Sequence, residues 1–219
     1  LIEEHAFPSD HQAVTSHLTL RGQTAEKALV TVRPEPGSFL ISTERILESI
    51  EQHRDSLAMI LLPGVQYYTG QVFDMSRITS KAREYEIPIG LDLAHAVGNI
   101  PLQLHSWEVD FACWCTYKYL NAGPGALGGC FIHSRHSAKR DLPRLAGWWG
   151  HERETRFEMK PDFVPSPNAQ GWQLSNPPIL ALAPILSSLH LFAQAGGIER
   201  LREKSLRLTS YLRSLLLHK

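Results

Sequence analysis

Cysteine is scarce in this chain, with three residues among 219, and they are Cys113, Cys115 and Cys130. An odd, small number of cysteines does not build the disulfide framework of a small secreted domain. We therefore expect three reduced thiols packed in the core. Metal-binding spacing is also missing, because the eleven histidines include no HExxH or comparable pattern, and we expect no metal site.

An excess of charge is missing too, since 22 basic residues balance 22 acidic ones. Composition therefore gives no reason to expect nucleic acid or anionic lipid as a partner, and a small molecule is expected. No apolar run approaches the length of a membrane span. Glu3 and Glu4 stand where a secretory signal would carry basic residues, so a cytoplasmic location is expected. Because Leu1 is not a methionine, we expect a fragment of a longer protein.

Apolar runs alternate with helical patterns along the first two thirds of the chain. Runs at residues 57–62, 87–91, 109–115 and 128–132 predict strands, and the first, apolar on both faces, reads as a central parallel strand. A helix with a hydroxyl cap from Ser42-Thr43 is predicted from about Thr43 to His53, and a second helix, capped by Asp74, is predicted to run to Tyr85. The region 141–178 is predicted to be an elaborate loop, followed by helices at 179–195 and 198–217. This order predicts an α/β fold with a mainly parallel sheet flanked by helices.

Two polar residues close neighbouring strands of this predicted sheet. Asp92 follows the run 87–91, and Lys118 follows the run 109–115. Ligands of open α/β sheets bind at the carboxyl ends of the strands. Pyridoxal phosphate needs a lysine amine for a Schiff base and a carboxylate beside its pyridine nitrogen. Either residue alone is better read as a turn cap or a surface lysine; the pair, with His95 close behind, favours the cofactor.

Six motifs give the chain a family resemblance. They are FPSD at 7–10, GVQYYTGQ at 64–71, DLAHAVGN at 92–99, VDFACWCTYKYLNAG at 109–123, GWWGHE at 147–152 and SNPPI at 175–179. Together they span nearly the whole chain, and it resembles kynureninase of the fungal type.

The resemblance implies a pyridoxal-phosphate-dependent transferase-like large domain and a hydrolase. Such an enzyme cleaves L-kynurenine or 3-hydroxy-L-kynurenine to an anthranilate and L-alanine, in tryptophan catabolism and NAD biosynthesis. Which substrate is preferred is not evident from the motifs. The expected division is a cofactor-binding domain at 1–197, incomplete at its start, and a helix at 198–219 leading to a further domain.

Roles for single residues follow from the same resemblance. Lys118 is expected to bind the cofactor and move the substrate's α-proton, and Asp92 to hold the pyridine nitrogen, with His95 beside it. In the FPSD motif, comprising Phe7, Pro8, Ser9 and Asp10, the proline predicts a rigid loop, with Asp10 opening the next helix. The resemblance implies that this motif is a cofactor platform, with Phe7 stacked on the pyridine ring and Asp10 hydrogen-bonded near it.

Three further residues complete the expected site. Tyr117 is expected to act as general acid and base or simply to bind the phosphate. Trp148 and Asn176 are expected to reach the active site of the neighbouring subunit, which implies a homodimer. No arginine falls in a motif matching the family's grip on the substrate carboxylate.

Two other classes of protein remain possible at this point. A cysteine desulfurase of the same fold would share Asp92, His95 and the lysine, but it would need a cysteine on a mobile loop, and all three cysteines fall in predicted strands. A non-catalytic relic of the fold would be expected to have lost Lys118, which is present.

Overall fold

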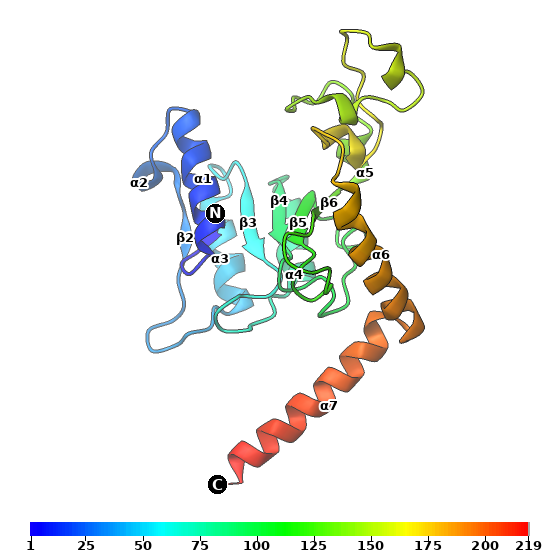
Figure 1. The fold of residues 1–219 in the computed structure, drawn as a ribbon. Coiled ribbons are helices and arrows are strands. Elements are labelled where there is room, and N and C mark those ends of the chain that lie inside the picture. Colours follow the sequence, from blue (N-terminus) through cyan, green and yellow to red (C-terminus); the bar gives the residue numbers. More distant parts are fainter. Residues whose placement is uncertain (219) are drawn as a thin grey trace.

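The central sheet of the computed structural model, which describes residues 1–218, has four strands (Figure 1). They are β3 (Ile60–Pro63), β4 (Ile89–Asp92), β5 (Phe111–Cys115) and β6 (Gly128–Ile132), in that spatial order. The pairs β3–β4 and β4–β5 are parallel, whereas β5–β6 is antiparallel. The expected mainly parallel α/β sheet is confirmed.

Two short strands form a separate two-stranded sheet beside β3. They are β1 (Ile2–Glu3) and β2 (Thr31–Val32), which pair in parallel. Leu61 donates its backbone N–H to the carbonyl of Leu1 at 2.9 Å, so β1 runs beside β3. The strand predicted at 57–62 begins only at Ile60. Its first residues instead complete a turn, because the N–H groups of Ser56 and Leu57 bond to the carbonyl of His53.

Two amphipathic helices cover the sheet, α3 (Thr43–His53) and α4 (Met75–Glu84). Ser42 and Asp74 cap them by accepting hydrogen bonds from the N–H groups at the third helical residue. Both helices were predicted with these caps. Their apolar faces form one core with the strands, and fully buried members of that core are Ile46, Ile50, Ile60, Leu62, Ile78, Ala82, Ile89 and Leu91.

The FPSD motif is not a loop, so the prediction of a rigid loop is wrong. Helix α1 (Pro8–Leu20) begins inside the motif, with Phe7 as its N-cap, and a short α2 (Ala25–Ala28) follows. Proline suits the first helical position because its missing N–H is not needed there and its φ is already helical. Asp10 therefore lies in the first turn of α1 instead of opening it.

The cysteines are free, but the expected core packing is wrong for two of them. Cys113 and Cys130 are exposed, and Cys115 is half-buried. Successive strand residues point to opposite faces. In β5 it is Ala112 that enters the core, which leaves Cys113 on the other face of the sheet.

The region 141–178 holds only the short helices η1 (Trp148–Gly150), η2 (Arg156–Glu158) and η3 (Ala169–Trp172), after α5 (Ser134–Ser137). This matches the predicted loop region. Helices α6 (Ile179–Gln194) and α7 (Gly197–Leu217) then form a C-terminal arm, residues 179–217, and the far end of α7 extends away from the sheet (Figure 1).

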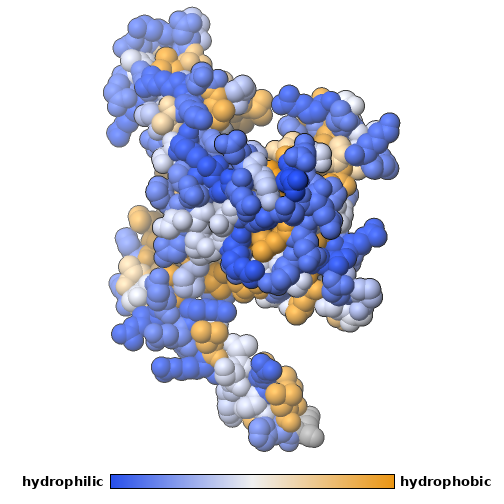
Figure 2. All heavy atoms as spheres, turned by 180° about the vertical axis from the view of Figure 1, so that it is seen from behind, coloured by the Kyte–Doolittle hydropathy of each residue, from blue (hydrophilic) through white to orange (hydrophobic). Residues whose placement is uncertain are grey.

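The C-terminal arm carries apolar side chains at its surface (Figure 2). Leu180 in α6 is 89% exposed and Leu216 in α7 is 66% exposed. Among residues 1–218 no single helix is long and apolar enough to cross a bilayer; α6 and α7 meet that test only as a pair bent by 74°. The proposed domain division after residue 197 stays a prediction.

Candidate active site

Asp92 is the last residue of β4, at the carboxyl end of the parallel strands. Its carbonyl accepts a hydrogen bond from the N–H of Gly64 at 2.8 Å, and its Oδ1 accepts one from the N–H of Ala94 at 2.8 Å. Asp92 is therefore a turn cap, as the simpler interpretation held. One oxygen suffices for that cap, so the carboxylate retains acceptor capacity for a ligand.

Lys118 lies in a closed loop that follows β5. The backbone N–H and the hydroxyl of buried Thr116 both bond to the carbonyl of Leu127, and the carbonyl of Thr116 accepts the N–H of Ala122 at 3.1 Å. Asn121, with a φ of 52°, turns the chain back so that its N–H reaches the carbonyl of Lys118. These contacts fix the backbone of Lys118, and its side chain reaches the ring of Phe7.

The aromatic ring of Phe7 lies next to the amine of Lys118. The distance from Lys118 Nζ to the ring centroid is 5.5 Å, within the range of a cation–π contact. Tyr67 meets Phe7 edge to face at 5.2 Å between centroids. The platform expected from the FPSD motif is thus adjacent to the expected lysine, although the two are more than 100 residues apart in the sequence.

Asp10 completes this cluster from the first turn of α1. Burial, together with the nearby carboxylates of Asp92 and Glu3, raises its pKa to about 7 against the opposing effect of Lys118. At neutral pH Asp10 therefore holds a proton in part of the molecules. Two close carboxylates with one ammonium nearby form a site that favours an additional positive charge.

His95 stands one turn after Asp92, and its ring meets Tyr119 edge to face at 6.2 Å. Burial and the positive charge of Lys118 lower its pKa, against the attraction of Asp92. The imidazole is therefore neutral at physiological pH and offers one donor and one acceptor nitrogen. It borders a hollow of about 650 Å³ lined by His95, Gly98, Lys118, Tyr119, Asn121, Phe192 and Leu201.

Three other predicted residues lie close to this cluster in the chain but are exposed. Pro8 and Ser9 occupy the first turn of α1 at the surface. Tyr117 is 51% exposed, and its pKa is raised by a hydrogen bond with Cys115. The hydroxyl of Tyr117 therefore stays protonated, as a general acid or a phosphate donor requires.

Trp148 and Asn176 are not brought to the cluster within this chain. Trp148 packs on Trp149 and Phe157 and donates its Nε1–H to the carbonyl of Arg156 at 3.1 Å. Asn176 is exposed and contacts Ser175. Over residues 1–218 no hydrogen bond, ion pair or ring contact joins either residue to Asp92 or Lys118.

Gln66 was missed by sequence reasoning, although it organises this part of the molecule. Its Nε2 donates to the carboxylate of Glu3 and to the carbonyl of His5, and its Oε1 accepts the N–H groups of Tyr68 and Thr69. The buried amide thereby joins the loop that carries the Phe7 contact to β1. A polar residue three positions after a buried strand was the available signal.

These residues fit pyridoxal phosphate. Asp92 and the partly protonated Asp10 suit a ring nitrogen that carries a proton, and Phe7 offers an aromatic face. Lys118 supplies the primary amine that an aldehyde requires. The cofactor would be held by Lys118, Asp92, Asp10 and Phe7, with His95 at the border of the site.

Comparison with known proteins gives the family. The model of the aminotransferase class-V family matches residues 9–218. A kynureninase of Xanthomonas oryzae pv. oryzae is 58% identical over 216 residues, which cover 99% of this chain and 51% of that protein. One from Xanthomonas axonopodis pv. citri is 57% identical with the same coverage. The chain thus spans about half the length of the curated relatives it matches.

Solved structures confirm the expected fold class. A cysteine desulfurase from Escherichia coli matches with a TM-score of 0.76 at 15% identity, over 100% of this chain and 51% of that one. An alanine–glyoxylate aminotransferase from Nostoc sp. matches with a TM-score of 0.68 at 20% identity, over 96% and 52%. The expected fungal type is not supported, because these kynureninase relatives come from Xanthomonas. The chain belongs to the aminotransferase class-V family.

Proposed function

We propose that this chain is part of a kynureninase that uses pyridoxal phosphate. The reaction adds water to L-kynurenine or 3-hydroxy-L-kynurenine and yields anthranilate or 3-hydroxyanthranilate with L-alanine. It would serve tryptophan catabolism and NAD biosynthesis, in the cytoplasm. The observation that carries the proposal is the cluster of Lys118, Asp92, Asp10 and Phe7 in a chain 58% identical to a kynureninase.

Lys118 and Asp92 have the central roles. When bound, pyridoxal phosphate supplies an electron sink that stabilises negative charge on the substrate's carbon atoms. The Nζ of Lys118 would hold the cofactor, release it to the substrate amine and then move the proton at the substrate's α-carbon. Asp92 would keep a proton on the ring nitrogen, because its negative charge stabilises that cation.

Asp10 and Tyr117 would manage the remaining protons. With its pKa raised to about 7, Asp10 can give up its proton when a positively charged ring nitrogen arrives. The hydroxyl of Tyr117 would give a proton to, or take one from, the substrate's γ-carbonyl during hydration. A phosphate hydrogen bond is the alternative role of Tyr117.

A homodimer would complete the site. Trp148 is 46% exposed and Asn176 is exposed, and neither contacts the cluster of its own chain. Both are therefore free to reach the substrate's aromatic ring in a neighbouring subunit. Mixing Asn176→Ala subunits with Lys118→Ala subunits would restore part of the activity, because one of the two sites in each heterodimer is then intact. Absence of any rescue would contradict shared sites.

Product analysis of the full-length protein tests the activity itself. Incubation with L-kynurenine should release anthranilate and alanine in equal amounts, and the 3-hydroxy substrate should release 3-hydroxyanthranilate. Lys118→Ala should abolish release, whereas Lys139→Ala, at an exposed position outside the cluster, should not. Sulfide release from L-cysteine without anthranilate would instead identify a desulfurase.

Borohydride reduction locates the lysine independently of turnover. Reduction of the cofactor-loaded protein should leave a pyridoxyl group on Lys118, which peptide mapping would find. An adduct on another lysine would refute the role given to Lys118. The positions of the cysteines argue against a desulfurase, which would need a cysteine on a mobile loop. Cys113, Cys115 and Cys130 all lie in strands β5 and β6.

A further inference from the structure

We propose that Cys113 and Cys130 form a reversible disulfide across strands β5 and β6, which makes this pair a redox modification site beside Asp92. The two residues are direct partners in the antiparallel register. Both side chains are exposed and both thiols are free. The inference does not depend on the proposed kynureninase activity.

The hydrogen-bond pattern shows which kind of cross-strand pair they form. In the same register, His133 donates to the carbonyl of Asp110 at 2.9 Å and Thr116 to that of Leu127 at 3.2 Å, so these opposed residues are hydrogen-bonded pairs. Such pairs alternate with non-hydrogen-bonded ones, which places Cys113 and Cys130 in the latter class. The carbonyl of Cys113 accordingly faces β4, where it accepts the N–H of Leu93 at 2.8 Å.

Non-hydrogen-bonded pairs bring side chains close enough for a disulfide. Their Cα atoms lie about 4.5 Å apart, at the short end of the roughly 4.4–6.8 Å that disulfides span. A bridge at that short separation forms with some distortion and is correspondingly easy to reduce. This spacing therefore favours a reversible disulfide rather than a permanent crosslink.

The position of the pair connects it to the candidate active site. Asp92 in β4 is the register partner of Cys113 in β5, so a row of neighbouring residues runs from Asp92 through Cys113 to Cys130 on one face of the sheet. Although both side chains keep solvent-accessible surface, partial desolvation by the surrounding protein together with Asp92 and Asp10 raises the pKa of Cys113 to about 11, and partial desolvation raises that of Cys130. Both are therefore thiols at neutral pH, next to the carboxylate.

Glutathione disulfide, a small-molecule disulfide, is the oxidant that balances the step. The thiolate of Cys130 attacks one of its sulfur atoms, and a mixed disulfide forms as one glutathione leaves with the proton that Cys130 lost. The thiolate of Cys113 then attacks the Cys130 sulfur and expels the second glutathione. Two electrons pass from the two protein thiols to the reagent, and two glutathione thiols are released.

Cys115 supplies a matched control within the same strand. It lies two residues from Cys113 on the same face of β5, but its partner across the strand is Gly128. It therefore has no opposed thiol and should stay reduced under conditions that oxidise the pair.

The test is oxidation of the full-length protein with glutathione disulfide at mildly alkaline pH. After an acid quench, the unfolded protein is treated with a maleimide and digested for mass spectrometry. We expect a Cys113–Cys130 bridge, lighter by two hydrogen atoms than the separate peptides, with the maleimide on Cys115. Dithiothreitol should restore all three labels, and the oxidation rate should rise about tenfold per pH unit while the thiols remain protonated.

Variants separate the pair from general thiol reactivity. Cys115→Ser should keep the bridge, whereas Cys130→Ser and Cys130→Ala should both lose it and melt near the wild-type temperature. Maleimide on all three cysteines after oxidation would overturn the proposal. So would a bridge that includes Cys115, or a glutathione adduct that persists on one cysteine without progressing to the bridge.

Discussion

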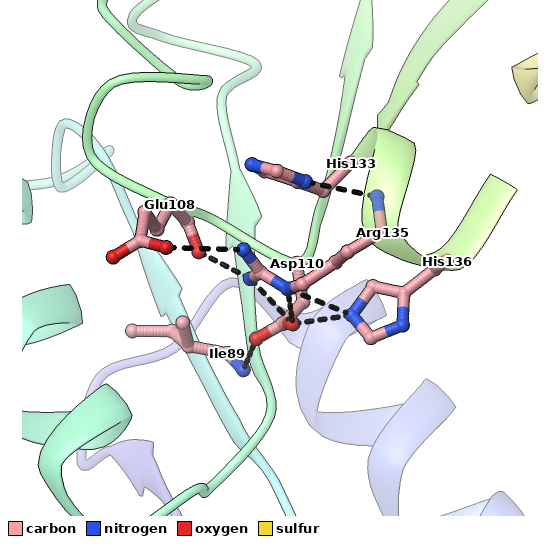
Figure 3. A network of polar contacts seen from close by, with 6 residues as sticks. All are labelled: Ile89, Glu108, Asp110, His133, Arg135 and His136. Carbon is pink, nitrogen blue, oxygen red and sulfur yellow. Dashed lines mark hydrogen bonds and ion pairs between the residues drawn. The ribbon is translucent and has the colours of Figure 1, made fainter. Parts of the chain in front are cut away.

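Two carboxylates at opposite ends of the sheet have opposite surroundings. Asp110 precedes β5 at the amino end, whereas Asp92 closes β4 at the carboxyl end. Asp110 accepts hydrogen bonds from the N–H of Ile89 at 2.8 Å and from Arg135 Nη2 at 2.6 Å, and its Oδ1 lies 2.5 Å from His136 Nε2 (Figure 3). Asp92 accepts one such bond, from the N–H of Ala94.

The pKa values of the carboxyl groups at the two ends of the sheet reflect this difference. Burial alone would raise the pKa of Asp110, but the hydrogen bonds from His136, Ile89 and Arg135 outweigh it and lower that pKa. At the other end, burial and neighbouring carboxylates raise the pKa of Asp10 to about 7. A carboxylate with its acceptor sites filled holds β4, β5 and the segment after β6 together. Asp92, whose side chain accepts only the N–H of Ala94 among the described residues, keeps acceptor capacity for a ligand.

Asp110→Ala should give the largest loss of stability. The substitution leaves the guanidinium of Arg135, 21% exposed, without its partner and removes the link to the N–H of Ile89. Breaking a buried ion pair in this way costs about 3–5 kcal/mol of unfolding free energy. Denaturant unfolding would measure it, with Asp55→Ala, at a side chain 92% exposed, as the control. Equal effects of the two substitutions would contradict the role given to the network.

Asp92→Asn should act on turnover instead. The amide still caps the turn at Ala94 but carries no charge to hold a proton on the ring nitrogen. We expect turnover of the full-length protein to fall about a hundredfold or more, equivalent to about 2.7 kcal/mol of barrier. Unfolding free energy should stay within about 1 kcal/mol of wild type. Near-normal turnover would remove Asp92 from the mechanism.

Local patterns accounted for much of this fold. The caps Ser42 and Asp74 and the strand ends at Asp92 and Cys115 follow from residue types at fixed spacing, and the structure has them. The cofactor lysine could be proposed because Lys118 follows a strand. Its roles, and those of the other predicted site residues, remain predictions.

Contacts between segments that are distant in the sequence could not be predicted from those local patterns. The proximity of Asp10 to Asp92 depends on how α1 packs at the sheet edge, and the Asp110 network joins residues up to 26 apart in sequence. Exposure of Cys113 depends on which face of β5 meets the helices. The start of α1 at Pro8 was misplaced because proline fits a loop and a first helical turn equally well.

The carboxyl groups at the two ends of the sheet should make stability depend on pH in opposite directions. The pKa of Asp10 rises from 3.8 to about 7 on folding, so the folded state binds the extra proton and stability falls as pH rises between those values. Asp110 has a lowered pKa, so its contribution is complete above pH 3.8 and is lost as pH falls below it. Unfolding midpoints of the cofactor-free protein should show both trends.

Asp10→Asn isolates the first of these trends. The amide cannot titrate, so the fall in stability between pH 3.8 and about 7 should become smaller, with a remainder from Glu3, whose pKa is also raised, while the acid limb from Asp110 remains. An unchanged profile would mean that Asp10 does not hold its proton in the folded protein.

Glu108→Ala should have the smallest effect, although Glu108 belongs to the same network as Asp110. Its carboxylate lies 3.9 Å from Arg135 Nη1 and is 59% exposed, so solvent screens the attraction and the pair contributes less than about 1 kcal/mol. The stronger link from Glu108 is its backbone carbonyl, which accepts from Arg135 Nη2 and survives the substitution. Thermal melting of Glu108→Ala beside Asp110→Ala, at low and high salt, makes the comparison. A loss as large as that of Asp110→Ala would mean that the network depends on the exposed charge of Glu108, and the contrast between filled and unfilled carboxylates would then not explain the amino end of the sheet.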